Sequence, residues 1–262
     1  MKVLKFGGSV LQNADDIRRV ADIVLKQYNT DHRLIVIVSA LYGITNQLAA
    51  MIELVHNDIN YTKQYEEITA FHMQILEQLQ IKCNTDGYKS VMELLILMSN
   101  VMISIKRQKI AKPSDKDLIL SFGERLSSTI IYHFLHLHFP EKVGYMNSCN
   151  LIKTNNNFTH ASVDLNLSRP LIQEFIAQHP YDITIGAGFI GSNTTGQITT
   201  LGRNGSDYTA ALIASAVGAD VLGAGGDPIQ NGLGRLRAHL SLLDPLGKLV
   251  SDARLAPGGQ LF

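Results

Sequence analysis

The most constraining feature of this chain is its alternation of short apolar runs with longer amphipathic stretches. Leu34–Val38 is a run of five apolar residues, four of them β-branched, and this pattern is typical of a strand covered on both faces. Val3–Phe6 is a similar run. Between them, Asn13 can cap a helix whose apolar residues share one face. Strands alternating with helices predict an α/β fold with a mostly parallel sheet.

The later segments extend this pattern. We expect residues 60 to 110 to be helical throughout, with Val91–Ile105 buried on several sides because apolar residues surround most of that helix. Leu118–Phe122 is interpreted as another buried strand, followed by a helix to about His138. The remaining expected elements are a helix from Ser168 to Ala177, a strand at Asp182–Ile185, a hairpin around Asn193–Gly196 and a final helix from Ser206 to about Val217.

Composition excludes several functional classes. The 262 residues contain 23 Lys and Arg and 23 Asp and Glu, so no global basic field favours nucleic acid or a membrane surface. The two cysteines, Cys83 and Cys149, lack zinc-ligand spacing, and His133, His136 and His138 lack good ligand geometry, so we predict no metal site. The sequence contains no run of 18 apolar residues, so we expect no transmembrane helix. Its first residues do not have the pattern of a signal peptide. We therefore expect a cytoplasmic protein.

Two glycine-rich segments are candidates for anion binding. In Lys5-Phe6-Gly7-Gly8-Ser9, a lysine ends a strand and the glycines let backbone N–H groups approach a phosphate. In the segment 202–207, Arg203 can bind a carboxylate, and Ser206 lies where a helix begins. Asp207 can cap that helix, coordinate a metal or orient the lysine. Each segment alone is also compatible with an ordinary tight turn or a helix cap.

Three more polar residues are candidates for a ligand site. Glu124 would follow a buried strand, at the edge of the sheet where α/β proteins bind ligands, and could accept hydrogen bonds from an ammonium group. It could equally stabilise the first turn of a helix. Ser39 and Thr45 flank the loop after Leu34–Val38, where hydroxyl residues also serve as ordinary turn and cap residues.

Together these motifs resemble the aspartate kinase family, and in particular the kinase portion of bifunctional aspartokinase–homoserine dehydrogenases. The family's Lys-Phe-Gly-Gly signature is present at Lys5–Gly8, its Val-Ser-Ala segment at Val38–Ala40 and its Gly-Glu-Arg-Leu-Ser segment at Gly123–Ser127. The strongest match runs from Gly188-Phe189-Ile190-Gly191 to Gly202–Ala211. The resemblance covers residues 1 to about 220 in order. It implies the amino-acid kinase fold, a three-layer αβα sandwich.

The resemblance also implies a reaction, which is the ATP- and Mg²⁺-dependent phosphorylation of the side-chain carboxylate of L-aspartate in amino-acid biosynthesis. Lys5 would bridge the ATP phosphates and Asp207 would orient it. Family members commonly form dimers or larger assemblies, so the resemblance implies a homo-oligomer. The implied phosphate-binding residues are Lys5, Gly7, Gly8 and Ser9, and the implied aspartate-binding residues are Ser39, Thr45, Glu124, Phe189, Arg203 and Ser206.

The resemblance weakens after Asp220. Residues 221–262 lack the family's Trp-Thr-Asp-Val-Asp-Gly nucleotide segment, and their periodicity is poor. We therefore expect an amino-acid kinase domain at 1–220, an atypical segment at 221–262 and a fold that is incomplete at its C-terminus. One alternative is a catalytically silent kinase-like fragment with a binding or subunit-partner role. Another is an amino-acid kinase with a different substrate.

Overall fold

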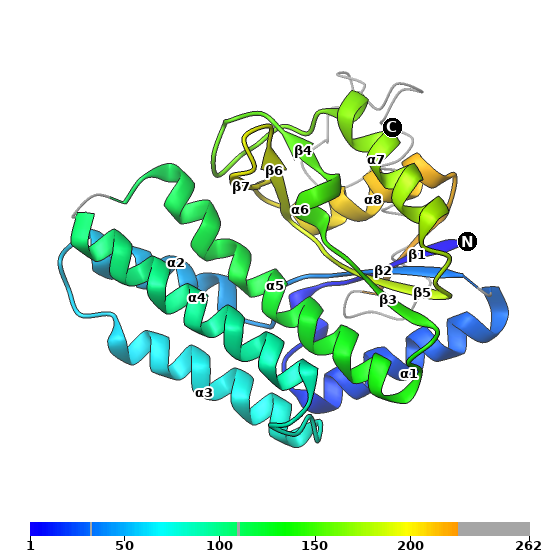
Figure 1. Ribbon diagram of the computed structural model, residues 1–262, viewed down its shortest axis with the longest axis horizontal. Helices are drawn as coiled ribbons and strands as arrows, with labels where there is room; N and C mark the ends of the chain where they lie inside the picture. The colour runs from blue at the N-terminus through cyan, green and yellow to red at the C-terminus, as the bar shows by residue number, and fades with distance from the viewer. Residues whose placement is uncertain (32, 109–110, 225–262) are drawn as a thin grey trace, which may run out of the picture.

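The computed structural model describes residues 1–31, 33–108 and 111–224 and shows an α/β fold around a five-stranded sheet (Figure 1). All neighbouring strands of this sheet run parallel, in the order β3-β5-β2-β1-β8. A smaller sheet has the order β4-β6-β7. The strands are β1 Lys2–Phe6, β2 Leu34–Val38, β3 Val143–Met146, β4 Lys153–Thr154, β5 Ile183–Ala187, β6 Ile190–Asn193, β7 Ile198–Thr200 and β8 Asp220–Ala224.

Helices cover both faces of the large sheet, so the predicted three-layer αβα architecture is confirmed (Figure 1). One face packs against α1 and against the helical layer formed by α2 to α5, and the other packs against α6, α7 and α8. The helices are α1 Ala14–Asp31, α2 Ile44–His56, α3 Thr62–Gln78, α4 Asp86–Gln108, α5 Pro113–His138, α6 Ser148–Leu151, α7 Leu165–Gln178, α8 Gly205–Val217 and the short 3₁₀ helix η1 Gly8–Val10.

The strand predicted at Leu118–Phe122 is wrong, because these residues lie within helix α5. A short apolar run cannot distinguish a buried strand from a buried helix. Helix α5 is buried on most sides because it lies between the sheet and the helices α2 and α4. Glu124 therefore lies in the middle of a helix and reaches the edge of the sheet from the side, instead of following a strand.

The helical region at 60–110 is interrupted, so the prediction of one helical stretch is also wrong. Helices α3 and α4 are separated by residues 79–85, where Gln80 takes a positive φ of 59°. Helix α4 is buried along one stripe only, since Ile96, Leu97 and Ile103 are 53%, 42% and 40% exposed.

Helix α4 is also the one described helix that is long and apolar enough, by length and composition alone, to cross a membrane. The search for 18 consecutive apolar residues missed it because polar residues interrupt its sequence. It packs against α3 and α5 in this structure.

Three boundaries differ from the predicted ones. Helix α7 begins at Leu165, not at Ser168, because the Asp164 side chain accepts hydrogen bonds from the N–H groups of the first turn. Helix α8 is preceded by Asn204, whose φ of 59° is left-handed, so Ser206 lies inside the helix and is not its cap. Strand β8 extends the sheet to residue 224 and pairs with β1. The rest of the predicted atypical segment, 225–262, lies outside the described residues, so the domain division stays a prediction.

Candidate active site

Three of the predicted motifs meet at the carboxyl edge of the parallel sheet. The register places Phe6 beside Val38 and Val38 beside Ala187, so the loops after β1, β2 and β5 emerge together. The Ser39 N–H donates to the Phe6 carbonyl at 3.0 Å, and the Gly188 N–H donates to the Val38 carbonyl at 2.8 Å. This edge is where open α/β sheets place their ligands.

An ion pair joins the first and the last motif. The Lys5 Nζ lies 2.8 Å from Asp207 Oδ1, and the two side chains are 15% and 39% exposed. Lys5 comes from β1 and Asp207 from the first turn of α8, about 200 positions apart in the sequence. The pair holds an ammonium group at the edge of the sheet, beside a helix N-terminus that favours anions.

The glycines beside Lys5 are closely packed. A Cβ atom on Gly7 would lie 3.2 Å from the Lys5 Nζ, and one on Gly8 would lie 3.0 Å from the Ala40 carbonyl oxygen. Ser9 follows in the short helix η1 and is exposed. The loop is therefore compact, and the absence of side chains at Gly7 and Gly8 keeps its backbone uncovered beside the lysine, as a phosphate site requires.

Glu124 reaches the same edge from helix α5. A Cβ on the preceding Gly123 would lie 2.8 Å from the Ala40 Cβ, so α5 packs directly on the loop after β2. Glu124 is 4% exposed, and its Oε2 has no hydrogen-bond partner among the described residues. Burial raises the pKa of this carboxyl to about 8, although hydrogen bonds from the backbone of Ala40 and of Glu124 itself oppose the shift.

The segment after β5 is fixed by contacts with α8. A Cβ on Gly188 would lie 2.6 Å from the Ser206 Oγ, so only glycine fits there. Phe189 takes a left-handed φ of 67°, and its N–H donates to the Thr209 Oγ1 at 3.1 Å. Its carbonyl accepts from the Leu201 N–H at 2.9 Å. A strained aromatic residue held on two sides is typical of a ligand site.

No hydrogen bond or ion pair joins the remaining predicted residues to one another in the described part of the chain. Thr45 is half-buried in the first turn of α2, and Ser39 accepts a hydrogen bond at its carbonyl from the Ser127 Oγ at 2.7 Å. Arg203 is exposed, and its guanidinium forms no ion pair within the described part of the chain. The structure thus brings Lys5 into contact with Asp207, and it brings Ser206 into contact with the 187–190 turn. The roles predicted for these residues stay predictions.

Sequence reasoning missed Asp117, which is fully buried on α5 two turns before Glu124. Its carboxylate accepts hydrogen bonds from the Thr159 N–H at 2.9 Å and from the Thr200 N–H and Oγ1, both at 2.8 Å. Thr159 takes a φ of 72°, which is unfavourable for a β-branched residue, and Gly202 packs beside it. Asp117 therefore holds the loop that precedes Arg203. No local pattern in the sequence marked it, because its neighbours Asp115 and Lys116 are charged as well.

No group of three or more His, Cys, Asp and Glu side chains could hold a metal ion in the described ranges. A divalent cation that enters with a nucleotide can take its ligands from phosphate oxygens and water without such a group. That is the usual arrangement for Mg²⁺ in phosphoryl-transfer sites, where one or two carboxylates suffice.

The fold and the arrangement at the sheet edge are those of the amino-acid kinase class of proteins, and the comparison with known families agrees. The model of the amino acid kinase family matches residues 1–227, and this chain belongs to that family. Its curated relatives include lysine-sensitive aspartokinase 3 of Escherichia coli, which is 33% identical over 219 residues. That alignment covers 82% of this chain and 46% of the relative.

One further relative and one solved structure support the same placement. The bifunctional aspartokinase/homoserine dehydrogenase of Buchnera aphidicola is 32% identical over 84% of this chain and 27% of its own length. The crystal structure of E. coli aspartokinase III in complex with aspartate and ADP superposes with a TM-score of 0.74 and 29% identity, covering 85% of this chain and 49% of that one. This chain spans about half or less of the length of these relatives.

Proposed function

We propose that this protein transfers the γ-phosphoryl group of ATP to the side-chain carboxylate of L-aspartate, giving 4-phospho-L-aspartate. This reaction would be the first step toward lysine, threonine and methionine, and it would take place in the cytoplasm. The observation that carries the proposal is the Lys5–Asp207 ion pair, set at the same sheet edge as the buried, unsatisfied carboxyl of Glu124. Phosphoryl transfer to an amino acid needs a cationic group for the phosphates of the donor and a carboxyl group for the ammonium of the acceptor, both at one place.

On the donor side, the lysine supplies the charge. Phosphoryl transfer depends mainly on positioning and on neutralising the charge of the moving group. In this proposal the Lys5 ammonium bridges phosphate oxygens, Asp207 keeps it directed at the edge of the sheet, and backbone N–H groups of Gly7, Gly8 and Ser9 bind phosphate. When bound with the nucleotide, Mg²⁺ would neutralise further phosphate charge.

On the acceptor side, the amino acid would be bound by both of its charged ends. In this proposal Glu124 accepts hydrogen bonds from the α-ammonium group, and Arg203 binds a carboxylate. Ser39, Thr45 and Ser206 add hydrogen bonds, and Phe189 closes the side of the site. The attacking carboxylate is ionised at neutral pH, so no general base is required.

The direct test is product formation. Purified protein would be incubated with ATP, Mg²⁺ and L-aspartate, and the acyl phosphate would be trapped with hydroxylamine as aspartyl hydroxamate. Loss of Lys5 removes the charge that stabilises the transition state, and we expect a decrease in rate of at least about 100-fold for Lys5→Ala. Lys26→Ala removes an exposed lysine of α1 and serves as the matched control, which should leave the rate unchanged.

Binding measurements separate this proposal from the alternatives. Product that survives Lys5→Ala would contradict the assigned role of the lysine. If no product forms, calorimetry with L-aspartate and with ATP decides between a silent fragment that binds aspartate and a chain without a ligand site. Hydroxamate formed from glutamate in preference to aspartate would identify a different amino-acid kinase. The oligomeric state, which we propose to be a homo-oligomer, is measured separately by light scattering.

A further inference from the structure

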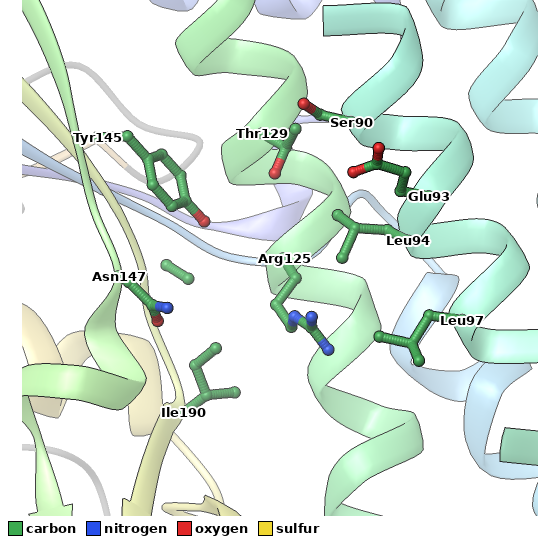
Figure 2. Close-up of a pocket in the computed structure, with 10 residues that line it drawn as sticks. Ser90, Glu93, Leu94, Leu97, Arg125, Thr129, Tyr145, Asn147 and Ile190 are labelled. Atoms are coloured by element: carbon green, nitrogen blue, oxygen red, sulfur yellow. The ribbon is translucent and has the colours of Figure 1, made fainter. Parts of the chain in front are cut away.

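A cavity of about 320 Å³, separate from the residues of the candidate active site, lies between helices α4 and α5 and the junction of β3 with α6 (Figure 2). This volume is at the lower end of the range for small-molecule pockets, roughly 300 to 1,000 Å³. None of the residues proposed above to bind ATP or aspartate lines it. Its lining residues are Ser90, Glu93, Leu94, Leu97, Arg125, Thr129, Tyr145, Asn147, Ala187 and Ile190.

Arg125 supplies a positive charge to this cavity. Its side chain stacks on the ring of Phe122, with the guanidinium carbon 4.8 Å from the ring centroid. Among the described residues, the guanidinium forms neither an ion pair nor a hydrogen bond. Burial lowers the pKa of Arg125, which reflects the cost of a charge removed from water without a partner.

The nearest ionisable groups leave this charge uncompensated. Burial raises the pKa of the Cys149 thiol to about 11, so the thiol stays neutral at physiological pH. Burial likewise raises the pKa of Tyr145, whose hydroxyl lies 3.0 Å from the Ser128 Oγ and stays protonated. Among the described residues no carboxylate lies within ion-pair distance of the guanidinium, so a ligand carboxylate can take that place.

The other lining residues define the kind of ligand. Figure 2 shows Tyr145 and Asn147 on one side and Arg125 and Thr129 on the facing helix α5, so hydroxyl and amide groups line the cavity together with the guanidinium. Leu94, Leu97 and Ile190 form an apolar part of the lining, which fits a short hydrocarbon body. Glu93 also lines the cavity and disfavours a dianion such as phosphate.

We propose that this cavity binds a small monocarboxylate with a short, branched apolar body, whose carboxylate is held by Arg125. The fork of N–H donors in a guanidinium matches a carboxylate in bidentate geometry. The cavity shares the turn 187–190 with the active site but none of its proposed ligands. The proposal therefore does not depend on aspartate phosphorylation.

The test is a titration of the whole chain with isovalerate, followed by the methyl NMR signals of Ile190 and Leu97. We expect saturable shifts of these signals, whereas Ile103, which lies outside the cavity on the same helix, should not shift. Isovaleramide has the same shape without the charge and should bind at least about tenfold more weakly, because charge-assisted hydrogen bonds are lost. Phosphate should also bind more weakly than isovalerate.

Two variants assign the binding to the guanidinium. Arg125→Gln should weaken isovalerate binding by at least about tenfold, whereas Arg107→Gln, which removes an exposed arginine near the end of α4, should leave it unchanged. If Arg125→Gln does not fold, the wild-type comparison of isovalerate with isovaleramide decides whether the protein recognises the charge of the carboxylate. Tyr145→Phe then tests whether binding takes place in this cavity. Equal binding of acid and amide, tighter binding of phosphate, or no shift at Ile190 would overturn the proposal.

Discussion

Helix α5 carries two buried carboxyl groups, Asp117 and Glu124, which lie two turns apart and have opposite environments. Burial raises the pKa of both. Every oxygen of Asp117 accepts a hydrogen bond from Thr159 or Thr200, whereas the Glu124 Oε2 has no partner among the described residues. A satisfied buried carboxylate stabilises a fold, and an unsatisfied one costs stability unless a ligand completes it. The contrast therefore separates a structural group from a candidate binding group.

The largest expected effect is the loss of folding stability on replacing Asp117, the structural carboxylate. Asp117→Ala leaves three donors without an acceptor, two of them buried on Thr200, and should lower the free energy of unfolding by about 3 kcal/mol. Urea denaturation monitored by circular dichroism measures it. Asp22→Ala, at an exposed position of α1, should change stability by less than about 0.5 kcal/mol. A loss no larger than in this control would remove Asp117 from its structural role.

The second substitution, at Glu124, tests whether the unsatisfied carboxyl binds L-aspartate. Glu124→Gln should weaken L-aspartate binding by roughly 100-fold, because a charge-assisted contact to the ammonium group is lost. At pH 5 its unfolding free energy should change by less than about 1 kcal/mol, because the carboxyl is then neutral in the folded protein and no hydrogen bond to Oε2 is broken. Calorimetry with aspartate and with ATP measures the two affinities. Equal weakening of both ligands would indicate a general disturbance of the site and not a contact to aspartate.

The pKa of Glu124 predicts a pH dependence of stability in the absence of ligand. The folded-state pKa of about 8 is raised above the ordinary value of 4.5, so the stabilising contribution is complete below pH 4.5 and is lost as pH rises through 8. Between pH 5 and 7 we expect wild-type stability to fall by about 2.5 kcal/mol more than that of Glu124→Gln. Denaturation curves at both pH values test this. Because Asp117 is present in both proteins, its own titration cancels, and parallel pH profiles would contradict the prediction.

The smallest effect concerns the contact that holds α5 against the loop after β2. Ser127→Ala removes the hydrogen bond from the Ser127 Oγ to the Ser39 carbonyl and should cost about 1 kcal/mol of stability. It should also weaken aspartate binding a few-fold, since the loop carries Ser39 and Ala40. Ser104→Ala on the exposed face of α4 is the matched control. A change in stability without any change in aspartate binding would show that the loop position does not depend on this contact.

The part of the site that follows strands was predictable from sequence. Lys5 ends a short apolar run before two glycines, and Leu34–Val38 has the composition of a doubly covered strand, so both loops could be placed at one sheet edge. The residues on α5 were less predictable. Leu118–Phe122 looked like a strand because a helix buried on most sides loses its amphipathic period, and Asp117 and Arg125 showed no local pattern at all.

The sequence by itself determined the alternation of strands and helices, the family and the motifs at the edge of the sheet, because local composition and turn chemistry encode them. Only the tertiary structure decided which distant groups meet: Lys5 with Asp207, Asp117 with Thr200, and Arg125 with its cavity. It also decided which buried charges are satisfied. These properties depend on the packing of elements far apart in the chain, and burial and hydrogen-bond partners are not local quantities.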